Sequence, residues 1–226
     1  MKHLLSVLFG ILILMTLSSC QDFSPRNPQV SSDDPKLEAT ASSLEAFDLA
    51  AENWQTMAGE GITLSLPETY RGGNPVRDLT TLETALTDLD QGYEKRLQPI
   101  KQNLEQTALI AFDARSLTTD ALTNVNVVQH PINQKTALED YLAATVEELQ
   151  ATHQIEEETI LTQNQASLGR IIANVTTDEG VSLKQLFYLQ RQGETVWITT
   201  YTTPASEFRG RLPNFEQSIG SLEIQS

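Results

Sequence analysis

The chain has 226 residues, with 15 basic and 30 acidic side chains that give a net charge of −15. Nucleic acid and anionic lipid both repel such a surface, so the composition excludes DNA or RNA binding and electrostatic attachment to a membrane. Cys20 is the only cysteine, which excludes disulfides within the chain. The acidity could attract cations or a basic partner, but keeping the chain in solution is its simpler effect.

The first twenty residues have the pattern of an export signal. Lys2 precedes an apolar run from Leu4 to Leu17. The run is too short to span a bilayer, which takes about 20 residues, but it is typical of a secretory signal. It ends in the sequence LSSC, which resembles the lipobox of bacterial lipoproteins: an apolar residue, two small residues and the cysteine that takes the lipid. We predict a signal peptide over residues 1–19 and lipidation of Cys20; the alternative is a plain signal or anchor with a chance cysteine.

Lipidation would place the protein on a membrane, outside the cytoplasm. Each buried CH₂ of an acyl chain such as palmitate contributes about 0.8 kcal/mol, so two or three chains on Cys20 would hold it there. The next residue is Gln21, not the aspartate that retains some lipoproteins at an inner membrane. Residues 20–43 are rich in Ser, Pro, Asp and Gln, which indicates a flexible tether that spans roughly 25 Å on average. Residues 44–226 are long enough for one folded domain.

The first half of this domain combines helix and strand patterns. Apolar residues between Leu44 and Met57 predict a short helix. Gly61–Pro67 alternates apolar and polar residues, as a half-buried strand does. The glycine-rich segment 70–75 predicts a loop, and a stripe of seven apolar residues from Leu79 to Ile100 predicts a long helix.

The second half contains most of the predicted strands. Two strands (107–114 and 123–129) and an amphipathic helix (135–150) precede four closely spaced strands (159–163, 168–176, 181–190 and 195–202). A last helix follows from Phe208 to Ile219, begun or kinked at Pro213, and then a short strand at 221–224. The turns between the four strands are short, which favours an antiparallel meander. Because the strands run together, we predict the α+β class: an α/β/α sandwich with helices on both faces of a central antiparallel sheet.

Several segments resemble PsbP-like proteins, in the same order along the chain. They are GITLSLP, AFDA, TNVNVV, TALEDYLAATVEEL and WITTYTTPASEFRGRLPNFEQSIGSLEI, so the resemblance covers about residues 58–225. The same fold occurs in Mog-type Ran-binding proteins and in LpqN- and DcrB-like bacterial lipoproteins. The resemblance implies a non-enzymatic binding or assembly factor for a membrane protein complex, for example of the photosystem II type, on a periplasmic or thylakoid-lumen face. The long helix from Leu79 and the loop 70–75 depart from PsbP itself.

The sequence contains no GxSxG, CxxC or HExxH motif, so we expect no catalytic residue, no metal site and no cofactor. His130 and His153 are placed in loops, where two exposed histidines are expected; sharing a Zn²⁺ or Mn²⁺ with carboxylates is the alternative. The acidic clusters lack the spacing of an EF-hand and are expected to be solvated. These clusters are Asp88, Asp90 and Glu94 on the long helix, and Glu156, Glu157 and Glu158.

The candidate binding residues are consecutive: Tyr70, Arg71, Gly72, Gly73 and Asn74. The two glycines permit close backbone approach, the arginine can donate two hydrogen bonds to one anionic group, and the tyrosine offers an aromatic face. We expect this loop to hold an anionic group or the backbone of a partner. The simpler alternative is a tight turn with Tyr70 packed on the sheet.

The aromatic side chains near the end of the chain bear on a second hypothesis. We expect them to build the core, but some could line a cleft for a small apolar ligand, lipid or pigment between the sheet and the last helix. They are Trp197, Tyr201, Phe208 and Phe215. The leading functional hypothesis is therefore a lipid-anchored, non-enzymatic binding or assembly factor. A carrier of a small apolar ligand and an enzyme are the alternatives.

Overall fold

The computed structural model describes residues 53–78, 80, 82–84, 105–118, 121–163, 166–177 and 180–225. The predicted signal peptide, Cys20 and the tether lie outside this part, as do residues 44–52. Thr80 and residues 82–84 are helical, in agreement with the predicted long helix, but the rest of that helix and its acidic side chains also lie outside. Among the described residues, no helix has the length and apolar character needed to cross a bilayer.

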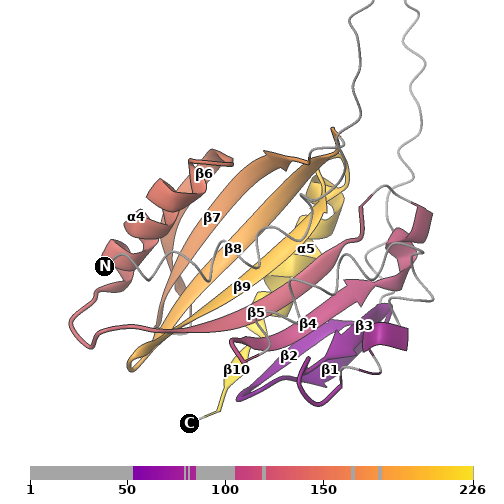
Figure 1. The fold of residues 1–226 in the computed structure, drawn as a ribbon, viewed down its shortest axis with the longest axis horizontal. Coiled ribbons are helices and arrows are strands. Elements are labelled where there is room, and N and C mark those ends of the chain that lie inside the picture. Colours follow the sequence, from indigo (N-terminus) through magenta and orange to yellow (C-terminus); the bar gives the residue numbers. More distant parts are fainter. Residues whose placement is uncertain are drawn as a thin grey trace, which may run out of the picture.

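The strands form two antiparallel sheets (Figure 1). The smaller sheet has the order β1-β2-β10, with β1 at Trp54–Ala58, β2 at Ile62–Pro67 and β10 at Glu223–Ile224. The larger sheet has seven strands in the order β3-β4-β5-β9-β8-β7-β6. Its strands are β3 (Tyr70–Gly73), β4 (Thr107–Asp113), β5 (Asn124–Pro131), β6 (Gln154–Gln163), β7 (Ala166–Thr176), β8 (Ser182–Gln192) and β9 (Thr195–Pro204).

One helix covers each face of the large sheet. Helix α4 (Leu138–Leu149) contacts β6, β7 and β8, and helix α5 (Phe208–Gly220) lies on the other face, where it contacts β9 and β2 (Figure 1). The α+β class and the sandwich of helices around a central antiparallel sheet are therefore confirmed. The small sheet was not predicted as a separate unit: it shares the α5 side of the large sheet.

Each face of the large sheet has its own hydrophobic core, because successive side chains of a strand point to opposite faces. On β9, Trp197 and Tyr201 face α5 and the small sheet, whereas Val196 and Ile198 face α4. Every residue of β4 is buried, which explains why its central residues 108–112, ALIAF, form a continuous apolar run and do not alternate.

The α5 side is filled by aromatic side chains. The Tyr201 ring stacks on Phe215 with centroids 4.7 Å apart, and Tyr188 meets the same tyrosine edge-on at 6.4 Å. The Tyr201 hydroxyl donates to Ser218 Oγ at 2.9 Å, which in turn donates to the carbonyl of Ser65 at 2.8 Å. This chain of contacts joins β9, α5 and β2. The aromatic residues therefore build the core, as expected. The alternative was that they line a ligand cleft between the sheet and this helix.

Strand pairing corrects the predicted end of the first helix. Trp54–Ala58 was predicted at the end of a helix but is strand β1, paired with β2 from Trp54 opposite Pro67 to Ala58 opposite Thr63. The hairpin turn at Gly59–Gly61 brings the two strands together, and their backbone hydrogen bonds outweigh the weak helical spacing. The last helix begins at Phe208, and Pro213 lies inside it.

We predict that Phe215→Ala lowers the free energy of unfolding by about 3–5 kcal/mol, the usual cost of removing a buried aromatic ring. Urea unfolding followed by circular dichroism measures this change. Val76→Ala is the control, because Val76 is 60% exposed and its truncation should change stability by less than about 0.5 kcal/mol. A loss below about 1 kcal/mol for Phe215→Ala would contradict the packing described here.

Candidate functional site

The predicted binding loop is a strand at the edge of the large sheet, which corrects the expectation of a loop or tight turn. Residues Tyr70 to Gly73 form β3 and pair with β4 from Tyr70 opposite Asp113 to Gly73 opposite Ile110. Tyr70 is 2% exposed and belongs to the core on the α5 side. A Cβ on Gly72 would lie 2.1 Å from the carbonyl oxygen of Ile110. The glycine is therefore required for the close approach of β3 to β4.

Asn74 directly follows β3 and is wholly buried. Its Oδ1 accepts hydrogen bonds from the backbone N–H groups of Val76 (2.8 Å) and Arg77 (3.1 Å), and its Nδ2 donates to Glu60 Oε2 at 3.0 Å. Its own backbone N–H donates to Asp78 Oδ2 at 3.0 Å. These partners build a rigid turn after the strand, so the side chain is engaged within the protein and not available to a ligand.

Arg71 is the one exposed side chain among the five predicted binding residues. Its guanidinium donates to the backbone carbonyls of Glu68 and Tyr70, the second at 2.9 Å. The Tyr70 carbonyl also accepts from Gln55 Nε2 at 2.9 Å. Within the described residues no ion pair neutralises Arg71. It therefore presents a positive charge at the surface of an acidic molecule.

A buried ionic cluster lies where β4 ends and α5 begins. Asp113 is fully buried, and its carboxylate accepts from Arg211 Nη1 at 2.6 Å and from Arg115 Nη2 at 3.2 Å. Arg211 also donates to Glu207 Oε2 at 2.7 Å and to Ser116 Oγ at 3.3 Å. The 3-10 helix η2 (Ala114–Thr118), which carries Arg115 and Ser116, directly follows β4.

The cluster keeps Asp113 ionised. Burial alone raises the pKa of this carboxyl, but the hydrogen bonds from Arg115 and Arg211 outweigh burial, so the pKa lies below its ordinary value. A lowered carboxyl pKa stabilises the fold above the pKa of the unfolded chain, about 4, and that contribution is lost as the pH falls through the folded value. A carboxylate held in this way is a structural anchor and not a general base.

Neither Asp113 nor Arg211 was singled out from the sequence. Arg211 precedes Phe215 by four residues, so it lies on the apolar stripe of α5 among residues that must be buried. A charged residue in such a position requires a buried partner, because an unpaired charge is costly in a core. Asp113 ends an apolar strand and has the opposite charge. This reasoning indicates that Arg211 needs an acidic partner in the core, but it does not single out Asp113.

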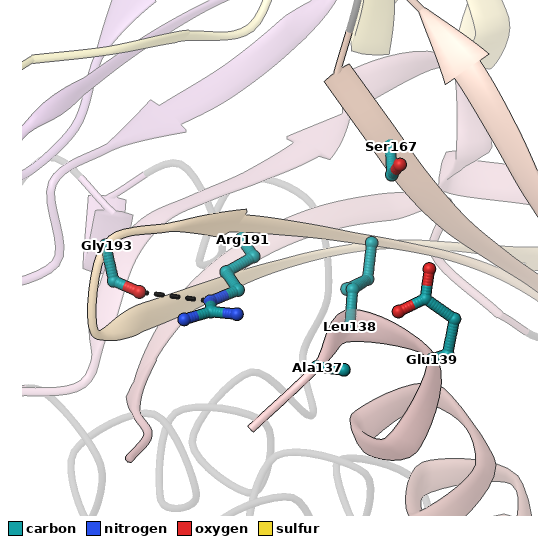
Figure 2. A pocket seen from close by; sticks show the side chains of 6 residues that line it. All are labelled: Ala137, Leu138, Glu139, Ser167, Arg191 and Gly193. Atoms are coloured by element: carbon teal, nitrogen blue, oxygen red, sulfur yellow. Dashed lines mark hydrogen bonds between the residues drawn. The ribbon is translucent and has the colours of Figure 1, made fainter. Parts of the chain in front are cut away.

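A surface hollow of about 430 Å³ lies between the start of α4 and the β8–β9 hairpin. Figure 2 shows Arg191 on the hairpin and Glu139 on the first turn of the helix, with Leu138 nearby. Arg191 donates to the carbonyls of Gly193 (3.1 Å) and Gln134 (2.6 Å), so it ties the hairpin to the segment before α4. Glu139 occupies the end of the helix that favours negative charge. Both charges thus have roles in the fold.

Both histidines are buried, which corrects the expectation of exposed loop residues. His130 lies within β5, and its Nδ1 is 2.9 Å from the hydroxyl of Tyr141 on α4. His153 follows the end of α4 and contacts Gln185 Oε1 through Nε2 at 2.9 Å. Since Gln185 Nε2 donates to Thr202 at 3.1 Å, the glutamine oxygen accepts the proton of His153. The two rings connect opposite ends of α4 to the sheet.

The acidic residues Glu156, Glu157 and Glu158 lie on strand β6. Glu156 pairs with Lys184 at 2.7 Å and Glu157 with Arg170, so two of the three are held in surface ion pairs. In the part of the chain that the structure describes, no three His, Cys, Asp or Glu side chains are grouped to hold a metal ion.

No family model matches the chain, and no curated protein matches it. Among solved structures it is similar to cyanobacterial PsbP (CyanoP) from Synechocystis, with a TM-score of 0.49 and 10% identity over 78% of this chain and 95% of that one. It is also similar to LpqN, involved in cell envelope biogenesis of Mycobacterium tuberculosis (0.46; 8% identity; 77% and 91%). A Pseudomonas aeruginosa protein of unknown function matches 48% of this chain and 78% of its own (0.43; 15% identity). These likenesses show a PsbP-like fold, and at 8–15% identity they concern the fold alone.

We predict that Asp113→Asn lowers the free energy of unfolding by about 3–5 kcal/mol, because it leaves the buried Arg211 without its counter-charge. Glu156→Gln is the matched control: it breaks a surface ion pair and should cost less than about 1 kcal/mol. Chemical denaturation at pH 7 measures both changes. If the two substitutions lowered the free energy of unfolding equally, the buried pair of Asp113 and Arg211 would contribute no more to stability than a surface ion pair.

Burial lowers the pKa of His130 and His153 below the ordinary value of 6.5. The unfolded chain therefore takes up these protons first, and stability, complete above about pH 7, falls as the pH drops below 6.5. We expect a loss of up to about 1.4 kcal/mol per histidine per pH unit. Urea midpoints between pH 8 and 5.5 measure the loss. The double variant His130→Gln, His153→Gln should show a weaker dependence of stability on pH. An unchanged slope would contradict the attribution of this loss to the two histidines.

Proposed function

We propose that the protein is a lipid-anchored, extracytoplasmic binding module without enzymatic activity, which acts through its surface on a membrane protein complex. The observation that carries the proposal is the packing of the α5 side. Tyr201 is fully buried between Tyr188 and Phe215, so side chains occupy the space in which a carrier would hold an apolar ligand. Recognition then belongs to the outer surface.

The strongest surface candidate is the segment formed by β3 and the turn after it. Arg71 carries an exposed charge, and Val76 is 60% exposed in the same segment. The hydrogen bonds of Asn74 hold the turn rigid, so little conformational entropy is lost when a partner binds. An exposed arginine and an exposed apolar side chain in one rigid segment suit a partner that offers a carboxylate and an apolar residue.

Membrane attachment supports the proposal from the sequence side. The LSSC box places Cys20 at the start of a tether long enough to hold the domain clear of lipid head groups. Labelling of cells with a tagged palmitate should mark the full chain, and Cys20→Ser should be unlabelled and released from membranes. An unlabelled wild-type chain would overturn the anchoring part of the proposal.

The partner is tested on the same membranes. A photo-crosslinking amino acid in place of Arg71 or Val76 should give a discrete adduct with another membrane protein, and the adduct should weaken when Cys20→Ser releases the chain. Lys135, an exposed residue before α4, is the control position and should give none. Absence of an adduct from Arg71 and Val76, or an equal adduct from Lys135, would refute this surface as the binding site.

A further inference from the structure

The two edges of the seven-stranded sheet are protected to different degrees. A strand at the edge of a sheet exposes backbone N–H and C=O groups that can pair with another strand. At one edge, β3 has only four residues, and side chains of Gln55 and Arg71 already occupy its Tyr70 carbonyl. At the other edge, β6 has ten residues. The β6 edge therefore offers the longer backbone to a partner.

Protection of β6 is confined to its first half. The pairing with β7 is irregular between Ile155 and Glu157, and such a bulge discourages a further strand. Glu156 and Glu157 add charge to the same half and are held by Lys184 and Arg170. Bulges and charges are the usual means by which proteins prevent pairing at sheet edges, so this half is closed to other strands.

The second half of β6, residues 159–163, lacks both forms of protection. It reads TILTQ, without charge, and it pairs with β7 in a regular register that includes Ile160 opposite Gly169 and Leu161 opposite Leu168. Ile160 and Leu161 are each 37% exposed and belong to the three large apolar side chains that are exposed within the described residues. Being consecutive on a strand, they lie on opposite faces of the sheet.

We propose that residues 158–162 of β6 pair antiparallel with the same residues of a second copy of this chain, which joins the two large sheets into one. A two-fold axis at Ile160 places this residue opposite Ile160 of the partner subunit and Glu158 opposite Thr162 of the partner subunit. No glutamate then faces a glutamate, although like charges directly opposite each other would destabilise the pair. The register also lets each Leu161 contact the other copy.

The charge of the chain restricts where two copies can pair. Two copies of a chain with a net charge of −15 repel each other, so they can meet only where charge is sparse, and residues 158–162 carry a single charged side chain, Glu158, at one end. Salt screens the repulsion and should strengthen pairing of two copies, whereas it would weaken binding of a basic partner strand. If Cys20 is lipidated, anchoring on one membrane raises the local concentration of the copies. The pairing itself does not depend on that anchor.

A cysteine at the two-fold axis tests the proposal in the full chain on its membrane. Opposed Cβ atoms of an antiparallel pair are about 4.5–5.5 Å apart, close to the separation that a disulfide bridges. Ile160→Cys should therefore give a reducible dimer on mild oxidation. The wild-type chain controls for Cys20, and Lys135→Cys, an exposed position outside both β6 and the proposed partner surface, controls for random collisions. Absence of the dimer, a dimer of equal yield from Lys135→Cys, or a disulfide to a different protein would each overturn the proposal.

A second measurement follows association without a crosslink. In analytical ultracentrifugation of the detergent-solubilised full chain, the dimer should strengthen as salt rises, and Leu161→Lys should weaken it at least tenfold. Thermal unfolding should show that the variant remains folded, since the side chain is partly exposed. A folded variant that dimerises like the wild type, or a dimer that dissociates in salt, would refute the proposal. The crosslinks from Arg71 and Val76 report on the proposed partner and are independent of this result.

Discussion

The buried ion pair between Asp113 and Arg211 is the contact at which four elements of the structure meet. Asp113 ends β4 and lies opposite Tyr70 of β3, while Arg115 of η2 and Arg211 of α5 donate to its carboxylate. An unpaired charge in this place would be costly, so the strand end, the following turn and the helix must remain in register with one another. This requirement fixes where α5 begins on the sheet. It also fixes the depth at which Tyr70 enters the core.

From this anchor, α5 extends along the large sheet and brings Phe215 and Ser218 to Tyr201. The same helix holds the small sheet, since Ser218 and Ser221 hydrogen-bond to the backbone of Ser65. The result is a core with aromatic rings in its centre and hydrogen-bonded hydroxyls at its margin. In the described part of the chain, aromatic side chains therefore fill the α5 side of the large sheet. The edge strands of that sheet, β3 and β6, are where its backbone groups can still accept or donate hydrogen bonds.

The sequence predicted the regular elements well where the apolar period was unambiguous. Strands β2, β4, β5, β7, β8 and β9 and helices α4 and α5 were each predicted within a few residues. β1 was missed because its few apolar residues also fit a helix, and only pairing with β2 decides between the two. β3 was missed because its two glycines are typical of turns, whereas here they permit close contact with β4.

The candidate site was predicted less well than the fold, for a related reason. Of the five predicted binding residues, Tyr70 and Gly73 are buried by their neighbours, Asn74 is engaged by Glu60 and by the backbone of the turn, and Arg71 alone reaches the surface as a charged group. His130 and His153 were assigned to loops, yet Tyr141 and Gln185 contact them from elsewhere in the chain. A residue type shows what chemistry a side chain can perform. It does not show which partners already occupy that side chain.

The sequence by itself determined the order of most of the elements, the face of each that must be buried, the acidity of the chain and the LSSC box before the domain. These properties follow from local periodicity and composition, which a single chain displays without reference to its fold. Only the tertiary structure decided that a second sheet exists, that β3 and β6 are the edges, and that Asp113 meets Arg211. Each of these depends on contacts between residues far apart in the chain, in the last case 98 positions, and no local pattern specifies such a contact.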